Sequence, residues 1–258
     1  MQTVFVGPPP RLAVSVAGDG ELVLFLHGIG GRRQNWQAQL AFFSREYKAA
    51  AWDARGYGES DDYDGPLDFR VFSADLLRVL DHFEAPRAHI VGLSMGGRIA
   101  RNFALHHPGR LRSLTLANTS PGFGALTQEA VQRFVAERRE LQPELQAKRV
   151  LGRNAPREAF DALVASMRAL RRESYLKTVE ASVSQDLAAP LEEIRAPTLV
   201  IASRHDPLYP PSISEDMARR IPGARLVIIE DAGHLSNLER PDEFNRALDE
   251  FLRERSLK

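Results

Sequence analysis

The amino-acid sequence predicts an α/β fold, with a mostly parallel central sheet, helices on both of its faces and an inserted helical cap. Short apolar runs alternate with longer amphipathic segments as far as residue 117, which is the pattern of parallel strands joined by helices. Strand-like runs are then missing between residues 120 and 190, and the alternation resumes at residue 198. We therefore expect residues 1–120 and 191–258 to form the core and residues 121–190 to form the cap.

Composition and turn residues define the expected strands. Segments 3–6 and 12–17 alternate in polarity and are joined by Gly-Pro-Pro-Pro, which is typical of an antiparallel pair. Segment 22–26 is apolar throughout, as a strand covered on both faces should be. The other expected strands are 49–52, 89–91, 111–117, 198–202 and 225–229.

The expected helices rest on apolar residues spaced three and four apart. Segment 68–84 carries Phe72, Leu76 and Val79 at such intervals, which places them on one helical face. The expected core helices are 34–47, 68–84, 97–107, 211–221 and 242–255, and the expected cap helices are 127–142, 143–151, 156–170 and 173–185.

Composition limits the classes of function. The 258 residues have a hydrophobic content of 43%, which suits one large domain with an insertion. Lys and Arg (34) balance Asp and Glu (34), so no overall field indicates a nucleic acid or a membrane surface as partner. The lack of cysteine excludes disulfides, thiolate catalysis and cysteine-ligated metals.

The chain also shows no sign of export or of membrane insertion. Residues 1–10 lack the basic start and the long apolar run of a signal peptide. No apolar stretch approaches the roughly 20 residues that span a bilayer. We expect a cytoplasmic protein that acts on a small molecule, and the sequence leaves its oligomeric state open, a homo-oligomer included.

The stretch Gly92-Leu93-Ser94-Met95-Gly96 is a G-x-S-x-G turn between an expected strand and an expected helix. Such a sharp turn exposes the middle side chain and holds its backbone in a strained conformation. Ser94 would lie at the helix N-terminus, where outward-pointing N–H groups favour developing negative charge. The pattern predicts a nucleophilic serine, and the alternative is that Ser94 is an ordinary N-cap.

A serine hydroxyl becomes a nucleophile when a base takes its proton and a third group orients that base. His234 and Asp206 each follow an expected strand, at the sheet edge where open α/β sheets place their sites. Their order after Ser94 fits the order nucleophile, acid, histidine. Asp231, three residues before His234, is the competing acid, although local geometry makes it harder for this side chain to reach the ring. The alternatives are a surface-loop role for His234 and a turn-capping role for Asp206.

A tetrahedral oxyanion needs two backbone donors. We expect the first from Met95, which follows the nucleophile, and the second from Ile29, in the Gly-rich loop 27–31 after an expected strand. We interpret His27 as a residue that braces that loop rather than one that reacts. The Gly-rich loop 53–60 lacks the P-loop pattern, and no His, Asp and Glu cluster has metal-ligand spacing. The sequence therefore predicts no metal and no cofactor.

Five motifs, in this order, resemble the α/β-hydrolase superfamily: HGIGG, DARGYGES, GLSMGG, ASRHDP and AGHLSNLERP. The segments LANTSPGF and GHLSNLE make the chain most similar to the 3-oxoadipate enol-lactonase and small carboxylesterase branch. The match covers nearly the whole chain and is least specific in the cap. It implies a Ser94–His234–Asp206 triad, an oxyanion hole at Ile29 and Met95, and cofactor-free hydrolysis of an ester or lactone.

Three residues are candidates for substrate contact: Phe134, Arg138 and Trp36. Arg138 lies one turn after Phe134 near the apolar side of segment 127–142, so it could reach the cleft and pair with a substrate carboxylate. The alternative is a side chain that extends its charged end into water. Two other functions use the same residues: acyl transfer or perhydrolysis through the same acyl-enzyme, and a ligand receptor that turns over slowly.

Overall fold

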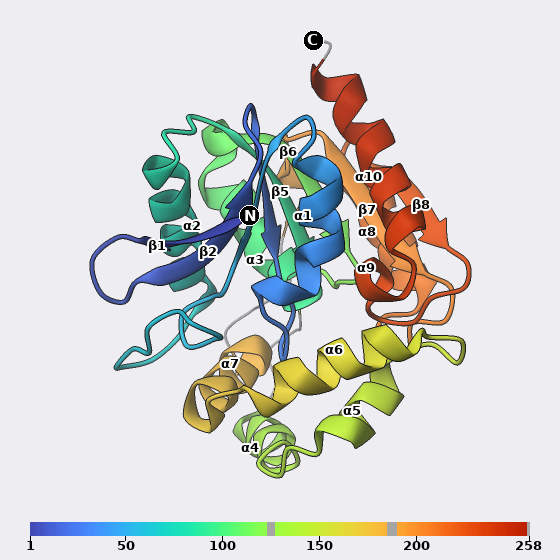
Figure 1. Ribbon diagram of the computed structural model, residues 1–258. Helices are drawn as coiled ribbons and strands as arrows, with labels where there is room; N and C mark the ends of the chain where they lie inside the picture. Colours follow the sequence, from blue (N-terminus) through green and yellow to red (C-terminus); the bar gives the residue numbers. More distant parts are fainter. Residues whose placement is uncertain (123–126, 185–189, 257–258) are drawn as a thin grey trace.

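The computed structural model describes residues 1–122, 127–184 and 190–256. One eight-stranded sheet runs in the order β1-β2-β4-β3-β5-β6-β7-β8 (Figure 1). The strands are β1 (Gln2–Val6), β2 (Leu12–Ala17), β3 (Leu22–Leu26), β4 (Lys48–Trp52), β5 (Ala88–Leu93), β6 (Leu111–Ala117), β7 (Thr198–Ser203) and β8 (Arg225–Ile229). Strand β2 is antiparallel to β1 and β4, and the remaining pairs are parallel. The expected α/β fold with a mostly parallel sheet is confirmed.

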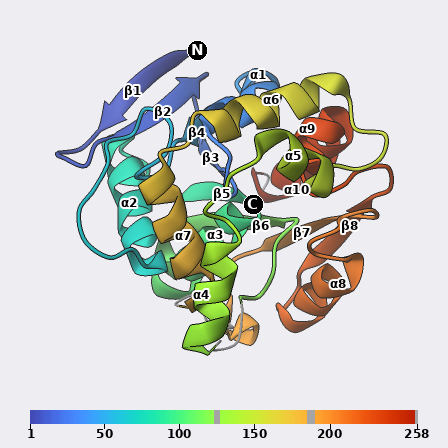
Figure 2. The same ribbon diagram turned by 90° about the horizontal axis from the view of Figure 1, so that it is seen from below.

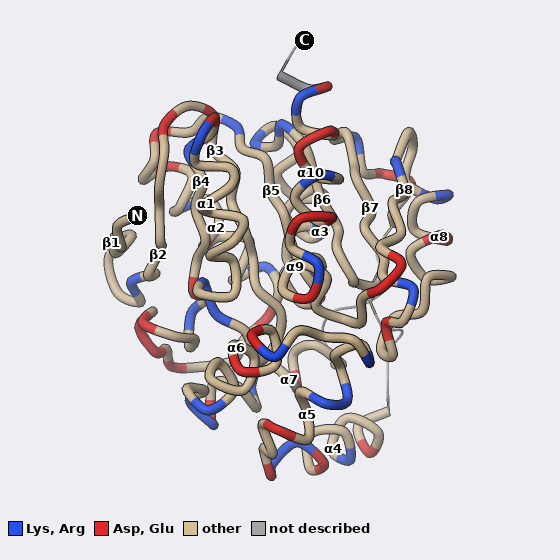
Figure 3. The backbone as a smooth tube through the Cα atoms, turned by 45° about the vertical axis from the view of Figure 1, so that its right-hand side comes forward, with Lys and Arg blue, Asp and Glu red and all other residues tan. Residues whose placement is uncertain are grey.

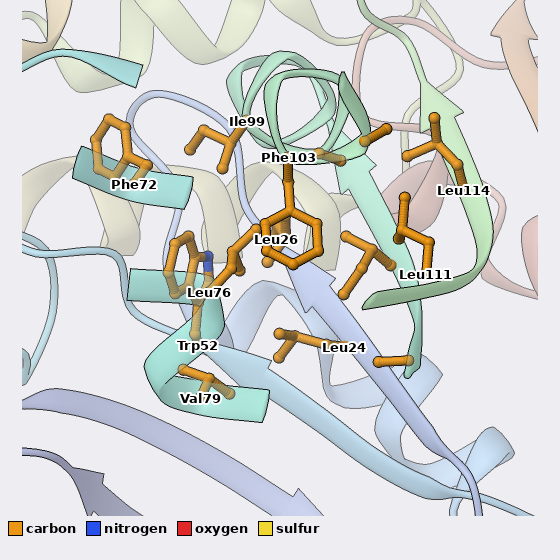
Figure 4. Close-up of a cluster of buried hydrophobic side chains, with 14 of the residues drawn as sticks. Leu24, Leu26, Trp52, Phe72, Leu76, Val79, Ile99, Phe103, Leu111 and Leu114 are labelled. Atoms are coloured by element: carbon orange, nitrogen blue, oxygen red, sulfur yellow. The ribbon is translucent and has the colours of Figure 1, made fainter. Parts of the chain in front are cut away.

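Helices cover both faces of this sheet. The core helices are α1 (Gln37–Phe43), α2 (Phe69–His82), α3 (Met95–His106), α8 (Pro211–Arg220), α9 (Ser236–Glu239) and α10 (Pro241–Ser256). Helices α2 and α3 bury their apolar residues against one face, together with Leu24, Leu26 and Trp52 of the sheet (Figure 4). Met217 of α8 belongs to the same cluster. Helices α1 and α10 cover the other face, where Phe43 and Phe244 are buried.

Four further helices lie across one end of the sheet (Figures 1 and 2). They are α4 (Gln128–Ala136), α5 (Pro143–Val150), α6 (Arg157–Arg168) and α7 (Arg172–Ser184). Helices α5 and α6 share a small apolar cluster of their own, which includes Leu151 and Leu163. We refer to α4–α7 as the cap, and the limits 121–190 of the cap as a separate unit stay a prediction.

Some boundaries differ from those expected. Segment 34–47 is not one helix, because a 3₁₀ turn, η1 (Arg33–Trp36), precedes α1. Helix α4 ends at Ala136, well before residue 142, and Pro143 opens the next helix. Proline disfavours helical backbone at the residue before it, and its fixed φ suits a first helical turn. Helix α9 was not expected, and Gln185 at the end of segment 173–185 lies outside the described residues.

Charge is spread evenly over the molecule. Figure 3 shows Lys and Arg interspersed with Asp and Glu along the helices and loops, whereas the strands carry few charges. Within the described ranges, no helix combines the length and the apolar character needed to cross a bilayer.

The packing of Gly96 predicts a large effect of a single methyl group. A Cβ at this position would lie 2.2 Å from the carbonyl oxygen of Leu26, so strand β3 would have to shift. We expect Gly96→Ala to lower the free energy of unfolding by about 1–3 kcal/mol, the usual cost of overpacking, measured by urea denaturation. The control is Gly109→Ala, where a Cβ meets no atom within 4 Å. Equal stabilities of the two variants would contradict this packing argument.

Candidate active site

The backbone at Ser94 forms the sharp turn that the motif predicts. Ser94 has φ 55° and ψ −117°, outside the regions that non-glycine residues favour. Helix α3 starts at the next residue, and the Ser94 side chain makes no capping hydrogen bond to it. The N-cap alternative therefore does not account for this serine. A Cβ at Gly92 would lie 2.2 Å from the Gly96 oxygen, which explains why glycine flanks the turn.

His234 contacts the acid that the sequence favours. Its Nδ1 lies 2.9 Å from Oδ2 of Asp206, and both side chains are buried. The competing acid is excluded by position. Asp231 is half exposed and hydrogen bonded to Asn154 and Arg240 instead. The structure thus pairs His234 with Asp206.

Every acceptor position of the Asp206 carboxylate is used. Its Oδ1 accepts the backbone N–H groups of Leu208 (2.8 Å) and Tyr209 (3.0 Å). Its Oδ2 accepts the Asn118 side-chain amide at 3.1 Å in addition to His234. Burial alone would raise the pKa of Asp206, but its interaction with His234 and the hydrogen bonds from the Tyr209 and Leu208 N–H groups outweigh burial and lower the pKa. The carboxylate is therefore held in its ionised form.

Sequence reasoning missed Asn118 and Thr119, which follow strand β6. Asn118 has a positive φ of 44°, donates to Asp206, and accepts a 2.6 Å hydrogen bond from the Ser236 hydroxyl. Thr119 donates a 2.6 Å hydrogen bond to the carbonyl oxygen of Ser94. The segment LANTSPGF could have pointed to both residues, because it contains the end of a strand that lies beside the serine turn.

The loop that follows β3 lies against the nucleophile candidate. A Cβ at Gly28 would lie 3.0 Å from the Cβ of Ser94, and Ile29 faces the same cavity as Ser94. His27 braces this loop, as expected: its Nε2 accepts the Ala54 N–H (3.1 Å), so its Nδ1–H donates to the Gly28 oxygen (2.8 Å). Burial lowers the pKa of His27, which keeps the ring neutral.

Met95 stands at the first position of α3. The first N–H groups of a helix have no acceptor within it, so the Met95 amide is available to an oxyanion. The Met95 side chain itself is buried in the core.

A cavity of about 420 Å³ lies between the core and the cap. Ser94 and His234 both line it, as do Ile29 and Gly30 of the loop after β3. The cap side is mostly apolar, with Phe134, Leu141, Leu163, Met167 and Leu170 among its lining residues. This is the shape and lining of a small-molecule site.

Two of the three substrate-contact candidates reach this cavity. Phe134 and Arg138 line it, and the Arg138 guanidinium stacks 3.4 Å from the centre of the Phe134 ring. The prediction for Trp36 is wrong. Trp36 is 1% exposed, is absent from the lining of this cavity and packs its ring against Phe25 and Phe244, because an aromatic side chain in a first helical turn serves the core equally well.

The site offers no obvious place for a metal. Across residues 1–122, 127–184 and 190–256, no three His, Asp or Glu side chains are grouped to hold an ion. Asp53 and Arg55, in the Gly-rich loop after β4, form ion pairs with Arg33 and Asp75 respectively. These two charges of the loop are therefore paired with other parts of the protein.

A family model described as the alpha/beta hydrolase fold matches residues 21–241. The chain belongs to the α/β-hydrolase family. This hydrolase is 28% identical over 241 residues to 3-oxoadipate enol-lactonase 2 of Acinetobacter baylyi, with 91% of this chain and 90% of that relative covered. The resemblance inferred from the motifs is thereby confirmed.

Two other relatives broaden the comparison. RutD of Pseudomonas savastanoi pv. phaseolicola, a candidate carbamate hydrolase, is 31% identical over 91% of this chain and 94% of its own. The solved structure of a thermophilic esterase from Thermogutta terrifontis has a TM-score of 0.87 at 27% identity and matches 99% of both chains.

The lowered pKa of Asp206 predicts part of the pH dependence of stability. A carboxyl with a lowered pKa in the folded chain stabilises the fold above its ordinary pKa, and this contribution is lost as the pH falls through the lowered value. We expect Asp206→Asn to reduce the free energy of unfolding at neutral pH. The difference in free energy of unfolding between this variant and the wild type, called the gap below, should narrow below pH ~3. Urea titrations at both pH values measure the gap.

The matched control is Asp64→Asn, at an exposed loop position. It should stay within about 0.5 kcal/mol of the wild type, as surface substitutions usually do. A gap for Asp206→Asn that widens on acidification would contradict the assignment of a stabilising ionised carboxylate.

Proposed function

We propose that this α/β hydrolase is a serine esterase or lactonase that cleaves a small carboxylic ester through an acyl-enzyme on Ser94. One observation carries the proposal: the strained Ser94 turn opens into the same cavity as a histidine whose Nδ1 is bonded to a buried carboxylate. An enol-lactonase and an esterase among the relatives support the substrate class.

The mechanism follows from the roles of these groups. Ser94 Oγ attacks the acyl carbonyl while Nε2 of His234 takes its proton, and Asp206 stays ionised and holds the ring in the required tautomer. The N–H groups of Ile29 and Met95 stabilise the oxyanion. His234 then protonates the leaving oxygen, and activates a water that releases the acid from Ser94.

Removal of the Ser94 hydroxyl is the simplest test of this function. We expect Ser94→Ala to lower kcat by at least about 10³-fold on whichever ester or lactone is turned over, since the residual rate rests on binding and the oxyanion hole alone. The measurement is a panel of p-nitrophenyl esters, simple lactones and an enol-lactone. Thr119→Val, which replaces the hydroxyl that bonds the Ser94 carbonyl by a methyl group, should keep most of the activity. Full turnover by Ser94→Ala would end the proposal.

The cavity favours a substrate that carries a negative charge. Among the described residues that line it, Arg138 and Arg149 are basic and Glu137 is acidic. Burial lowers the pKa of Arg138, even though Tyr175 and Glu137 act in the opposite direction. Glu137 is 4.0 Å away, at the limit of an ion pair. A substrate carboxylate would give Arg138 a closer partner.

Arg138→Ala should lower kcat/KM more for an acidic ester than for a neutral one. A charge-assisted hydrogen bond is worth about 1.5–3 kcal/mol, so kcat/KM for mono-p-nitrophenyl glutarate should fall about tenfold or more. The value for p-nitrophenyl butyrate should change less than about twofold. Arg133→Ala, at an exposed position of α4 five residues earlier, is the control and should affect neither. Equal losses on both esters would show that Arg138 contributes packing rather than charge recognition.

A further inference from the structure

The buried carboxylate of Glu239 lies next to the loop that carries His234. Glu239 is 1% exposed and ends helix α9, five residues after the histidine. Its Oε1 accepts the N–H of Leu235 at 3.1 Å, and its Oε2 accepts the N–H of Gly233 at 3.0 Å. The residues on both sides of His234 are therefore fixed by one side chain.

The same carboxylate also binds the cap. Oε2 of Glu239 accepts a third N–H, that of Gly152, at 2.8 Å. Gly152 follows helix α5 of the cap. Two residues earlier, the Val150 carbonyl accepts a 2.8 Å hydrogen bond from the backbone N–H of His234 itself. Cap and histidine loop thus share both a main-chain bond and a buried anion.

The cap segment and the histidine loop meet backbone to backbone. A Cβ at Gly233 would lie 2.2 Å from the nitrogen of Gly152, and a Cβ at Gly152 would lie 2.9 Å from both the nitrogen of Gly233 and Oε2 of Glu239. Leu235 packs against apolar residues of the core and of the cap alike. This junction consists of residues 150–152, 233–235 and Glu239.

We propose that Glu239 is a positioning residue. Because it binds both the cap and the loop that carries His234, the cap helps to hold His234 in place. The cap segment 150–152 then sets the place of the general base as well as the shape of the substrate cavity. This inference rests on the proposed function of Ser94 and His234. It implies that turnover depends on the junction even for an ester too small to need the cap.

The size of the expected effect follows from the geometry of proton transfer. A base must come within about 2.6–3.2 Å of the hydroxyl that it deprotonates, and a displacement of about 1 Å can cost about 10²-fold in rate. A carboxylate that accepts several backbone N–H groups holds them more firmly than neutral acceptors do. Replacement of Glu239 by Gln would place an NH₂ donor against one of three N–H donors.

The test changes the junction from both sides. Gly152→Ala alters it from the cap and Glu239→Gln from the core, and neither touches Ser94, His234 or Asp206. The controls are Gly109→Ala, with no atom near the added Cβ, and Glu243→Gln, an exposed glutamate in the next helix. For each variant, kcat and KM are measured on p-nitrophenyl acetate and on the hexanoate, with circular dichroism and Tm to confirm folding.

We expect both junction variants to lose about tenfold or more in kcat on the acetate, with KM changed less than twofold. The controls should stay within twofold of the wild type. Because the two changes act on one junction, the double variant should lose little more than either single variant. If Glu239→Gln fails to fold, Gly152→Ala still decides the question.

Folded variants with wild-type kcat on the acetate would overturn the inference, and so would effects confined to KM for the hexanoate. The Ser94→Ala variant distinguishes a failure of the positioning role of Glu239 from a failure of the proposed function. If Ser94→Ala is inactive while both junction variants keep full kcat, the positioning role of Glu239 fails and the serine hydrolase proposal stands. If Ser94→Ala remains active, the proposed function itself fails.

Discussion

The close approach of backbone to backbone at the turn after β5 is the constraint on which the site depends. Gly92 and Gly96 lie so near each other, and Gly96 so near Leu26, that no Cβ fits at either position. This proximity forces Ser94 into its positive φ and brings the start of α3 beside the loop after β3. The strain at Ser94 is maintained by its neighbours, strand β5, which is buried along its whole length, and the buried first half of α3, and strain persists in folded proteins where the surroundings hold it in this way.

A second constraint acts on the other side of the cavity. Asp206, Asn118 and Ser236 form a chain of buried hydrogen bonds that joins the loops after β6, β7 and β8. Glu239 separately bonds the loop after β8 to the cap, through the N–H groups of Gly233, Leu235 and Gly152. Buried polar groups of this kind are costly unless each is satisfied, so the network specifies one arrangement of the loops. The cap helices thereby close the cavity and bind the histidine loop at the same time.

Much of this arrangement could be predicted from the sequence. Strands β3, β6 and β8 have the bounds expected for them, because each is a short apolar or β-branched run between turn residues. The G-x-S-x-G turn and the two strand-end residues, Asp206 and His234, were recognisable because their spacing along an α/β chain places them at one edge of the sheet.

What could not be predicted depends on contacts between distant segments. Helix α9 has only four residues, too few to show a period, so the burial of Glu239 gave no signal. Asn118 is defined by a partner 88 positions away. Trp36 was misplaced because aromatic residues serve cavities and cores equally well, and only the fold shows that its ring meets Phe25 and Phe244.

The most direct measurement of the central claim is the mass of the protein caught during turnover. The enzyme is mixed with a p-nitrophenyl ester, quenched in acid within milliseconds, digested and analysed by mass spectrometry. We expect one acyl group per chain, on the peptide that contains Ser94. An acyl group on another residue, or ester cleavage with no covalent adduct at any quench time, would contradict it.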